Sequence, residues 1–199
     1  MNRRMSPEDR RDALVQAAVR VIARGGVVAA TTRAVVAEAR MPLGAFHYVF
    51  ASREELLAEV VRTVTDGERM AAELALPAGA TLEETVAAAL TSYLDLLIAD
   101  PERELALTEL SLYGLRHDPA LARRQHDLYF LEMEALLRQV AERCRIRWTE
   151  PLPDLARSLI VVTEGITGTW LTDRDTDAAR GVIRRVATWV AASAERVDA

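Results

Sequence analysis

The chain contains no lysine, and all 25 of its lysine-type or arginine-type positions are arginine. We attribute this to genome base composition rather than to mechanism. Cys144 is the single cysteine, which excludes an intramolecular disulfide and a zinc site built on several cysteines. We expect Cys144 to be a small, partly buried residue in a long helix, with a redox-sensing intermolecular pair as the alternative. Aromatic residues are only 5% of the chain while hydrophobic residues are 50%, so the core must consist mainly of leucine, valine and alanine.

Long apolar runs are also missing. No stretch reaches the roughly 18 residues that a transmembrane helix requires. The first residues, Asn2-Arg3-Arg4, are followed by further charged residues rather than by the apolar segment of a signal peptide. We therefore predict a cytoplasmic protein with no membrane partner.

Alanine and leucine are abundant and no strand pattern is obvious, which predicts an all-α protein. N-cap residues, capping boxes, prolines and glycines divide the chain into nine expected helices. Gly25-Gly26 should end the first helix, and residues 148–153 should form a proline-rich loop. The expected helices cover approximately residues 7–24, 31–39, 43–49, 53–74, 82–99, 101–115, 119–145, 154–171 and 176–194.

Charge is unevenly distributed along the chain. Residues 1–53 hold nine arginines and four acidic residues, a net charge of +5, whereas the remainder holds 16 arginines and 26 acidic residues, a net charge of −10. A basic N-terminal part on an acidic body is expected when only the N-terminal part meets phosphate.

Residues 31–57 predict a helix-turn-helix. The second and third expected helices are too short to be stable alone, and three residues, Arg40-Met41-Pro42, join them. Val35, Val36 and Ala39 should form the buried face of the first of these helices, and Phe46 and Phe50 that of the second. The helix over 43–49 would then be the one that enters a DNA major groove.

These residues resemble the TetR family of bacterial transcriptional regulators. The resemblance covers residues 13–57, about the first quarter of the chain, and the rest matches only in length and helical character. It implies a TetR-like all-α fold of about nine helices, with an N-terminal DNA-binding domain over 1–53, a connecting helix over 53–74, and an effector-binding and dimerisation domain over 54–199. The matching residues are Ala17, Val21, Ile22, Gly25, Gly26, Thr31, Ala39, Gly44, the run Phe46-His47-Tyr48-Val49-Phe50 and the segment Ser52-Arg53-Glu54-Glu55-Leu56.

The resemblance implies a set of DNA contacts. Arg33 should reach phosphate or a guanine edge, Gly44 should permit close approach of the backbone, and Arg53 should bind phosphate. His47 and Tyr48 should contact DNA, whereas Phe46 and Phe50 should be core. The full expected DNA-binding set is Thr32, Arg33, Leu43, Gly44, Ala45, His47, Tyr48 and Arg53.

The turn departs from the family pattern. Arg40 stands where glycine is usual, and if its backbone is left-handed the arginine costs roughly 1 kcal/mol. Pro42 replaces a serine-type cap, and Val49 replaces a phosphate-binding histidine or tyrosine. Leu43 and Ala45 replace positions that are often polar, so we suggest that they contact thymine methyl groups.

Polar and aromatic residues within the apolar helices of the body predict a pocket for a small, mainly hydrophobic effector. Each residue alone also fits an ordinary core or surface role. The candidates are Tyr93, Glu109, Tyr113, His126, Tyr129, Met133, Thr163, Thr167 and Trp170, with Glu164 adjacent.

The last two helices carry the expected surface of a homodimer, which would bind a palindromic operator. A line of small residues lies on the first of these helices and a wide apolar stripe on the second, part of which could be intramolecular core. The candidates are Val161, Gly165, Gly168 and Thr172, followed by Val182, Ile183, Val186, Trp189 and Val190.

The sequence therefore predicts a ligand-responsive transcriptional regulator, most simply a repressor, with no cofactor, no metal and no catalytic residue. Two alternatives remain. A helical regulator could act through a protein partner, and an all-helical enzyme could use Glu109, His126 and Glu164 as acid-base groups or metal ligands. The enzyme lacks support, because neither an HExxH motif nor another metal or nucleophile motif occurs.

Overall fold

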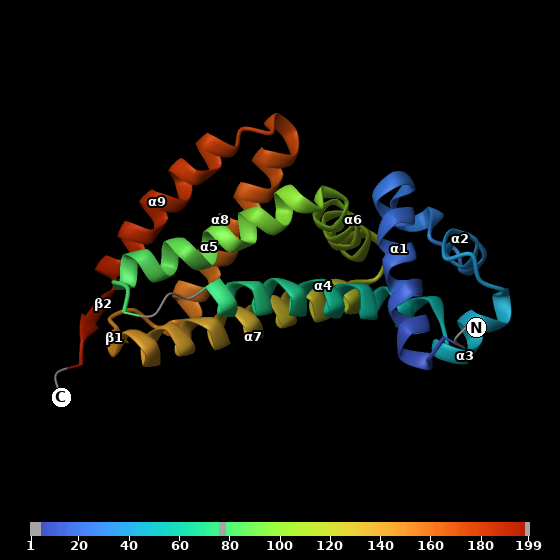
Figure 1. The fold of residues 1–199 in the computed structure, drawn as a ribbon, viewed down its shortest axis with the longest axis horizontal. Helices are drawn as coiled ribbons and strands as arrows, with labels where there is room; N and C mark the ends of the chain where they lie inside the picture. The colour runs from blue at the N-terminus through green and yellow to red at the C-terminus, as the bar shows by residue number, and fades with distance from the viewer. Residues whose placement is uncertain (1–4, 76–78, 198–199) are drawn as a thin grey trace. The chain divides into compact units, whose positions relative to one another are not determined.

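A computed structural model describes residues 5–75 and 79–197, with only the backbone described for 68–71 and 73–75. The described part is almost entirely helical, as predicted (Figure 1). Its elements are α1 (Pro7–Ala29), α2 (Thr32–Glu38), α3 (Leu43–Val49), α4 (Arg53–Ala75), α5 (Leu82–Ala99), α6 (Pro101–His117), α7 (Pro119–Cys144), β1 (Ile146–Trp148), α8 (Leu152–Asp173), α9 (Thr176–Ala192) and β2 (Ala194–Arg196). No helix in that part has the length and apolar character that crossing a membrane requires.

Side-chain caps fix the starts of the helices close to the predicted positions. Ser6 and Asp9 form a reciprocal capping box at α1, and Thr81 and Glu84 form another at α5. The Asp175 carboxylate accepts the Ala178 N–H at 2.9 Å and caps α9. Because each cap satisfies backbone N–H groups that the first helical turn leaves unpaired, it marks the boundary locally.

The first helix is interrupted where the two glycines predict a stop. Gly26 has φ 72° and ψ 172°, which lies outside the helical region, and the residues beyond it add only a short helical turn up to Ala29. A positive φ of this size is readily adopted by glycine because it has no Cβ. This confirms the predicted end of the first helix proper.

Two short strands were not predicted. β1 and β2 pair antiparallel, with Trp148 opposite Ala194. The pairing joins the segment that follows α7 to the segment that follows α9. Arg145 has φ 52° and ends α7, which redirects the chain into β1. The prediction of a loop over 148–153 and of a last helix reaching residue 194 is corrected accordingly.

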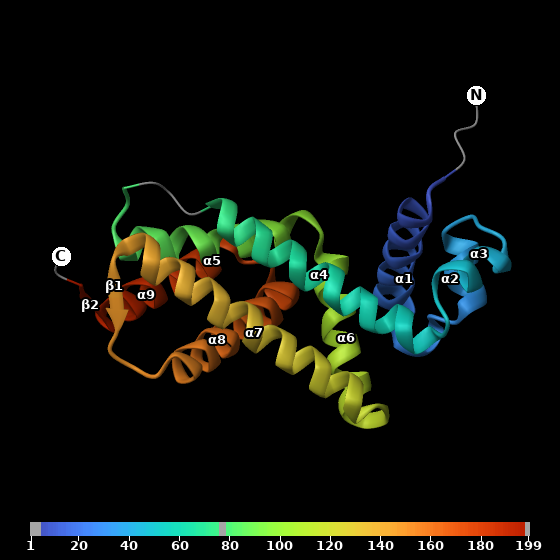
Figure 2. The same ribbon diagram turned by 90° about the horizontal axis from the view of Figure 1, so that it is seen from below.

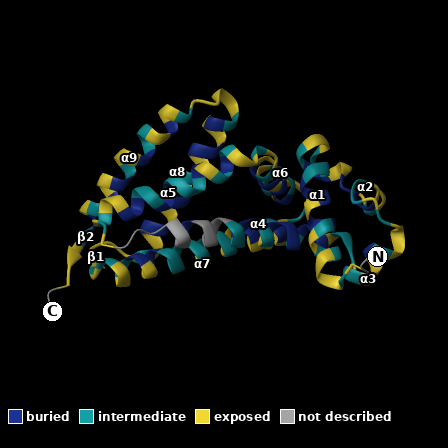
Figure 3. Cartoon of the chain, in the orientation of Figure 1, coloured by how far each residue is buried: buried dark blue, intermediate teal, exposed yellow. Residues whose placement is uncertain are grey.

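The chain forms two compact units. Of the described residues, the first comprises 5–64 and 102–126, and within it α1 packs against α2 and α3 (Figure 2). The second comprises the described residues of 65–101 and 127–197, and within it α5 lies against α8 and α9. The core of the second unit includes Leu94, Leu97, Leu155, Trp170, Ile183 and Val190. Buried faces run along these helices while their outer faces are exposed (Figure 3).

Candidate DNA-binding surface

The helix-turn-helix forms as predicted from α2, a tight turn and α3. Thr31 caps α2 by accepting the Ala34 N–H at 3.2 Å. Arg40 adopts φ 55° in the turn, so its backbone is left-handed and the condition for the roughly 1 kcal/mol cost is met. Pro42 stands at the N-cap of α3 and gives no side-chain hydrogen bond, again as expected. A seven-residue helix with no side-chain cap at its start must be held mainly by its packing.

The inner face of this motif is apolar and buried. Val35, Val36, Phe46 and Phe50 are all 6% exposed or less. The rings of Phe46 and Phe50 lie 5.6 Å apart, so one turn of α3 places both in the same core. This confirms their assignment as core residues.

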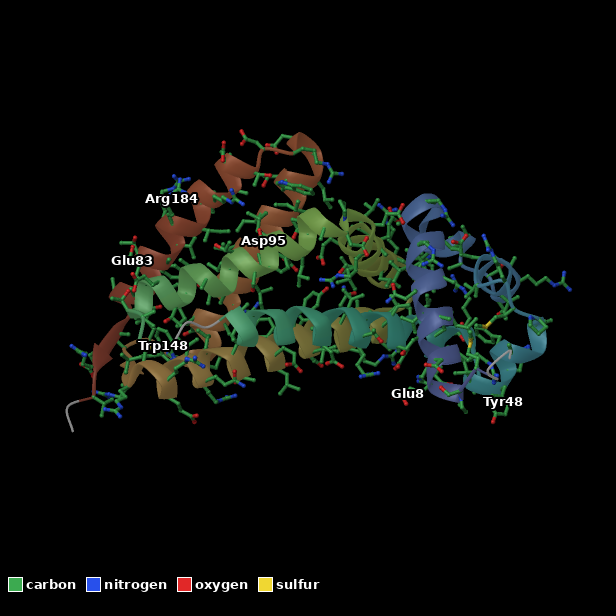
Figure 4. The ribbon with its side chains drawn as sticks, viewed as in Figure 1. Glu8, Tyr48, Glu83, Asp95, Trp148 and Arg184 are labelled. Carbon is green, nitrogen blue, oxygen red and sulfur yellow. The ribbon has the colours of Figure 1, made fainter. Side chains whose placement is uncertain are left out.

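The outer face of α3 is open to solvent. Tyr48 is 67% exposed and Leu43 is 42% exposed, and Gly44 and His47 are exposed as well. Figure 4 shows Tyr48 projecting from the α3 end of the first unit. A Cβ added at Gly44 would meet nothing within 4 Å, so this part of the surface is unobstructed. Ala45 is half-buried between the two faces.

Residues of α2 and α1 extend this surface. Arg33 is exposed and Thr32 is half-buried at the start of α2. Arg10, which sequence reasoning did not select, places its guanidinium carbon 5.2 Å from the Tyr48 ring centroid. The sequence around Arg10 could not indicate this contact, because α1 and α3 come together only in the folded unit.

Other arginines of the first unit are engaged by carboxylates. Arg20 and Arg24 both bind Glu38, which joins α1 to α2. Hydrogen bonds from these two guanidinium groups lower the pKa of Glu38. The positive charge left for a partner is therefore smaller than the count of arginines indicates.

Arg53 has an internal role that the sequence pattern did not predict. Its Nε donates to the carbonyl oxygen of Ala30 at 2.8 Å and its second terminal nitrogen donates to that of Val27. Its guanidinium also lies over the Tyr113 ring, 5.7 Å from the centroid. Arg53 thus donates to carbonyl oxygens at the end of α1, and a phosphate contact would have to use the remaining N–H groups of its guanidinium.

Comparison with known proteins agrees with this geometry. The sequence profile of the "bacterial regulatory proteins, tetR family" matches residues 14–60. The nicotine-responsive transcriptional repressor HdnoR of Paenarthrobacter nicotinovorans is 31% identical over 182 residues, which span 85% of this chain and 88% of HdnoR.

The chain belongs to the TetR family.

Solved structures show the same fold. A transcriptional regulator from Rhodococcus sp. Rha1 aligns with a TM-score of 0.77 at 19% identity, over 94% of this chain and 99% of that one. The multidrug-binding protein EbrR, solved with malachite green, aligns with a TM-score of 0.66 at 29% identity, over 92% and 98% of the two chains. This TetR-family protein is thus a transcriptional regulator with an all-α fold.

The candidate pocket residues of this TetR-family protein divide between the two units. Glu109, Tyr113 and His126 belong to the first unit, and the other candidates belong to the second. Glu109 lies beside Gly26, where a Cβ would come within 3.4 Å of its carboxylate, and Tyr113 packs against His117. His126 is exposed.

Within the second unit, Thr167 and Trp170 are buried and the other candidates are half-buried. The hydroxyl groups of Tyr93 and Thr167 share a hydrogen bond between α5 and α8. Trp170 is 6% exposed, and its Nε1 donates to the Thr176 hydroxyl at 3.0 Å. Tyr129, Met133 and Thr163 are half-buried. The Tyr93–Thr167 pair is the candidate contact that the structure brings together most directly.

The dimer candidates also separate into two groups. Val161, Gly165, Gly168 and Thr172 all lie exposed along one face of α8. On α9, Trp189 is 39% exposed and Val182 and Val186 are half-buried. Ile183 and Val190 are 2% and 0% exposed and belong to the core of the second unit. Because these two residues are already covered by their own chain, we remove them from the expected interface.

In the part of the chain that the structure describes, no three histidine, cysteine, aspartate or glutamate side chains gather as metal ligands. Cys144 is half-buried, as expected, with Sγ 3.7 Å from the Thr85 hydroxyl oxygen.

Proposed function

We propose that this TetR-family regulator is a homodimeric repressor that binds a palindromic operator through α3 and is released by a small, mainly hydrophobic effector. The observation that carries the proposal is the division of α3 into a buried side, Phe46, and an exposed side with Leu43, Gly44, His47 and Tyr48. A helix held on one side by the core and open on the other suits insertion into a major groove.

The same surface indicates how the contacts are divided. Tyr48 and His47 carry donors suited to phosphate, and Arg33 can reach phosphate or a guanine edge. Leu43 offers an apolar contact for a thymine methyl group. Thr32, Gly44 and Ala45 complete the proposed surface, with Arg10 supporting Tyr48 from α1.

The proposed effector rests on chemistry and on relatives. HdnoR responds to nicotine and EbrR binds malachite green, and both compounds are nitrogen-containing molecules with aromatic rings. In this chain the Tyr93 and Thr167 hydroxyls meet between α5 and α8, two helices that contribute to the apolar core of the second unit. Few polar groups among apolar side chains suit such a ligand. The effector must bind better to the conformation that does not bind DNA.

A gel-shift titration tests the proposal with the full chain and a duplex from upstream of its own coding region. We expect retention that weakens steeply between about 50 and 200 mM salt. Tyr48→Phe, which removes only the hydroxyl, should weaken binding by roughly fivefold on every retained sequence, because a phosphate contact carries no sequence information. Added nicotine or malachite green serves as the effector probe. Absence of salt-sensitive retention would contradict the proposal.

A further inference from the structure

Arg11 of α1 contacts both α3 and α4. Its Nε donates to the Glu59 carboxylate at 2.9 Å, and a terminal nitrogen donates to the Val49 carbonyl oxygen at 3.3 Å. Its other terminal nitrogen lies 3.7 Å from Glu55, and its guanidinium carbon lies 4.6 Å from the Phe50 ring centroid. One side chain of α1 thus contacts both α3 and α4.

The contact with Val49 acts at the end of α3. The last carbonyl groups of a helix lack partners within it and carry partial negative charge, so a guanidinium there is favourable. α3 has seven residues and no side-chain cap at its start. Arg11 therefore provides a polar anchor for a helix that has few of its own.

The Glu59 end of this connection is itself held. The Glu59 side chain is 10% exposed, and Arg62 binds it from the same helix at 2.7 Å. Hydrogen bonds from Arg62 and Arg11 lower the pKa of Glu59 to about 2, so the carboxylate stays ionised at any physiological pH. Because the Glu59 carboxylate stays charged and is held by Arg62, it can hold the Arg11 guanidinium in a fixed position relative to α4.

We propose that Arg11 is a positioning residue for DNA binding: it holds the C-terminal end of α3, with Tyr48, at a fixed place relative to α4 by binding the Val49 carbonyl and Glu59 together. This inference rests on the proposed function, because it assumes that α3 contacts DNA. Arg11 acts through α3 and needs no contact with phosphate.

The experiment compares full-length Arg11→Gln, Arg11→Lys and Arg62→Gln by fluorescence anisotropy on a duplex that the unaltered protein retains. Arg62→Gln is the matched control, because it also removes one of the two cations on Glu59 but leaves the contact with α3. We expect Arg11→Gln to weaken DNA binding about tenfold, comparable to the loss of one charge-assisted hydrogen bond. Arg62→Gln should stay within about twofold, since Arg11 still bridges Glu59 and the Val49 carbonyl oxygen in that variant.

Two further readouts separate positioning from other roles. A direct phosphate contact by Arg11 would reduce the salt slope by about 0.9, whereas positioning leaves the slope unchanged. Arg11→Lys keeps the charge but loses the fork that reaches Glu59 and Val49 at once, so we expect it to bind as weakly as Arg11→Gln. Melting temperatures establish that each variant is folded at the assay temperature, and Arg11→Lys gives the test if Arg11→Gln is not.

Several outcomes would overturn the inference: Arg11→Gln or Arg11→Lys binding like the unaltered protein, a reduced salt slope, or an equal loss in Arg62→Gln. If the unaltered protein retains no duplex, the proposed function fails instead.

Discussion

Arg40 has a backbone conformation that is unfavourable for a residue with a Cβ. Its φ of 55° lies in the left-handed region, where a Cβ crowds the following carbonyl oxygen. We expect Arg40→Gly to raise the free energy of unfolding by about 0.5–1 kcal/mol, the strain relieved less the extra entropy that glycine gives the unfolded chain. Chemical denaturation of the full chain measures this.

The matched control for Arg40→Gly is Arg123→Gly, at an exposed position inside α7. The same replacement in a regular helix should lower the free energy of unfolding by about 1 kcal/mol. Equal losses at both positions would show that the turn carries no relievable strain.

Leu43 is the first residue of α3 and is 42% exposed, so its apolar side chain is open to solvent. If it contacts a thymine methyl group, Leu43→Ala should reduce the preference for thymine at one operator position by about 1 kcal/mol and leave other positions unchanged. Selection of duplexes from a randomised pool by both proteins measures this preference. An unchanged preference at every position would exclude the contact.

At the scale of elements, the sequence predicted helix starts best because their signals are local. Ser6, Thr81 and Asp175 each bind backbone within three residues, so the cap is readable without the fold. β1 and β2 are three residues each and pair across 48 positions, as between Arg147 and Glu195, and such a pairing has no local signal. Short strands of this kind depend on tertiary contacts.

The candidate site shows the same division. Helical spacing separated Phe46 from Tyr48 correctly, because burial on a short helix follows its periodicity. It could not show that Arg53 binds the end of α1, or that Ile183 and Val190 are covered by their own chain. Those facts depend on which helix packs against each residue in the fold. An apolar stripe has the same sequence pattern whether it lies in a core or at an interface between chains.

The connection between α1 and α4 through Glu59 makes a prediction about acid stability. Because the pKa of Glu59 is lowered from 4.5 to about 2 on folding, its contribution is present above pH 4.5 and is lost as the pH falls toward 2. At neutral pH this contribution is at most about 3 kcal/mol and is reduced by solvent screening.

Glu59→Gln should therefore be less stable than the unaltered protein at pH 7, and the difference should shrink between about pH 4.5 and 2. Denaturation at a series of pH values measures both proteins. Glu142→Gln, which makes the same replacement at an exposed position on α7, is the matched control. A constant difference for Glu59→Gln would show that its ionisation is not linked to folding.

At the scale of the whole molecule, the proposed homodimer depends on whether the exposed face of α8 can associate with a second chain. Val161 is 62% exposed, and Gly165 and Gly168 would accept a Cβ with nothing within 4 Å, so another helix can approach closely there. The core of the second unit is complete without this face, because its buried residues lie on the other sides of α8 and α9. An arginine at 161 should therefore leave the fold intact while it opposes association.

We predict that Val161→Arg converts the protein from dimer to monomer in analytical ultracentrifugation, since a charge buried in an apolar interface without a partner is strongly unfavourable. Leu131→Arg on α7 is the matched control, because Leu131 is 61% exposed and lies outside the proposed interface. The monomer should also lose at least tenfold in affinity for a palindromic duplex, because only a dimer occupies both half-sites at once. A Val161→Arg protein that remains dimeric would show that the dimer interface lies on another face of the chain.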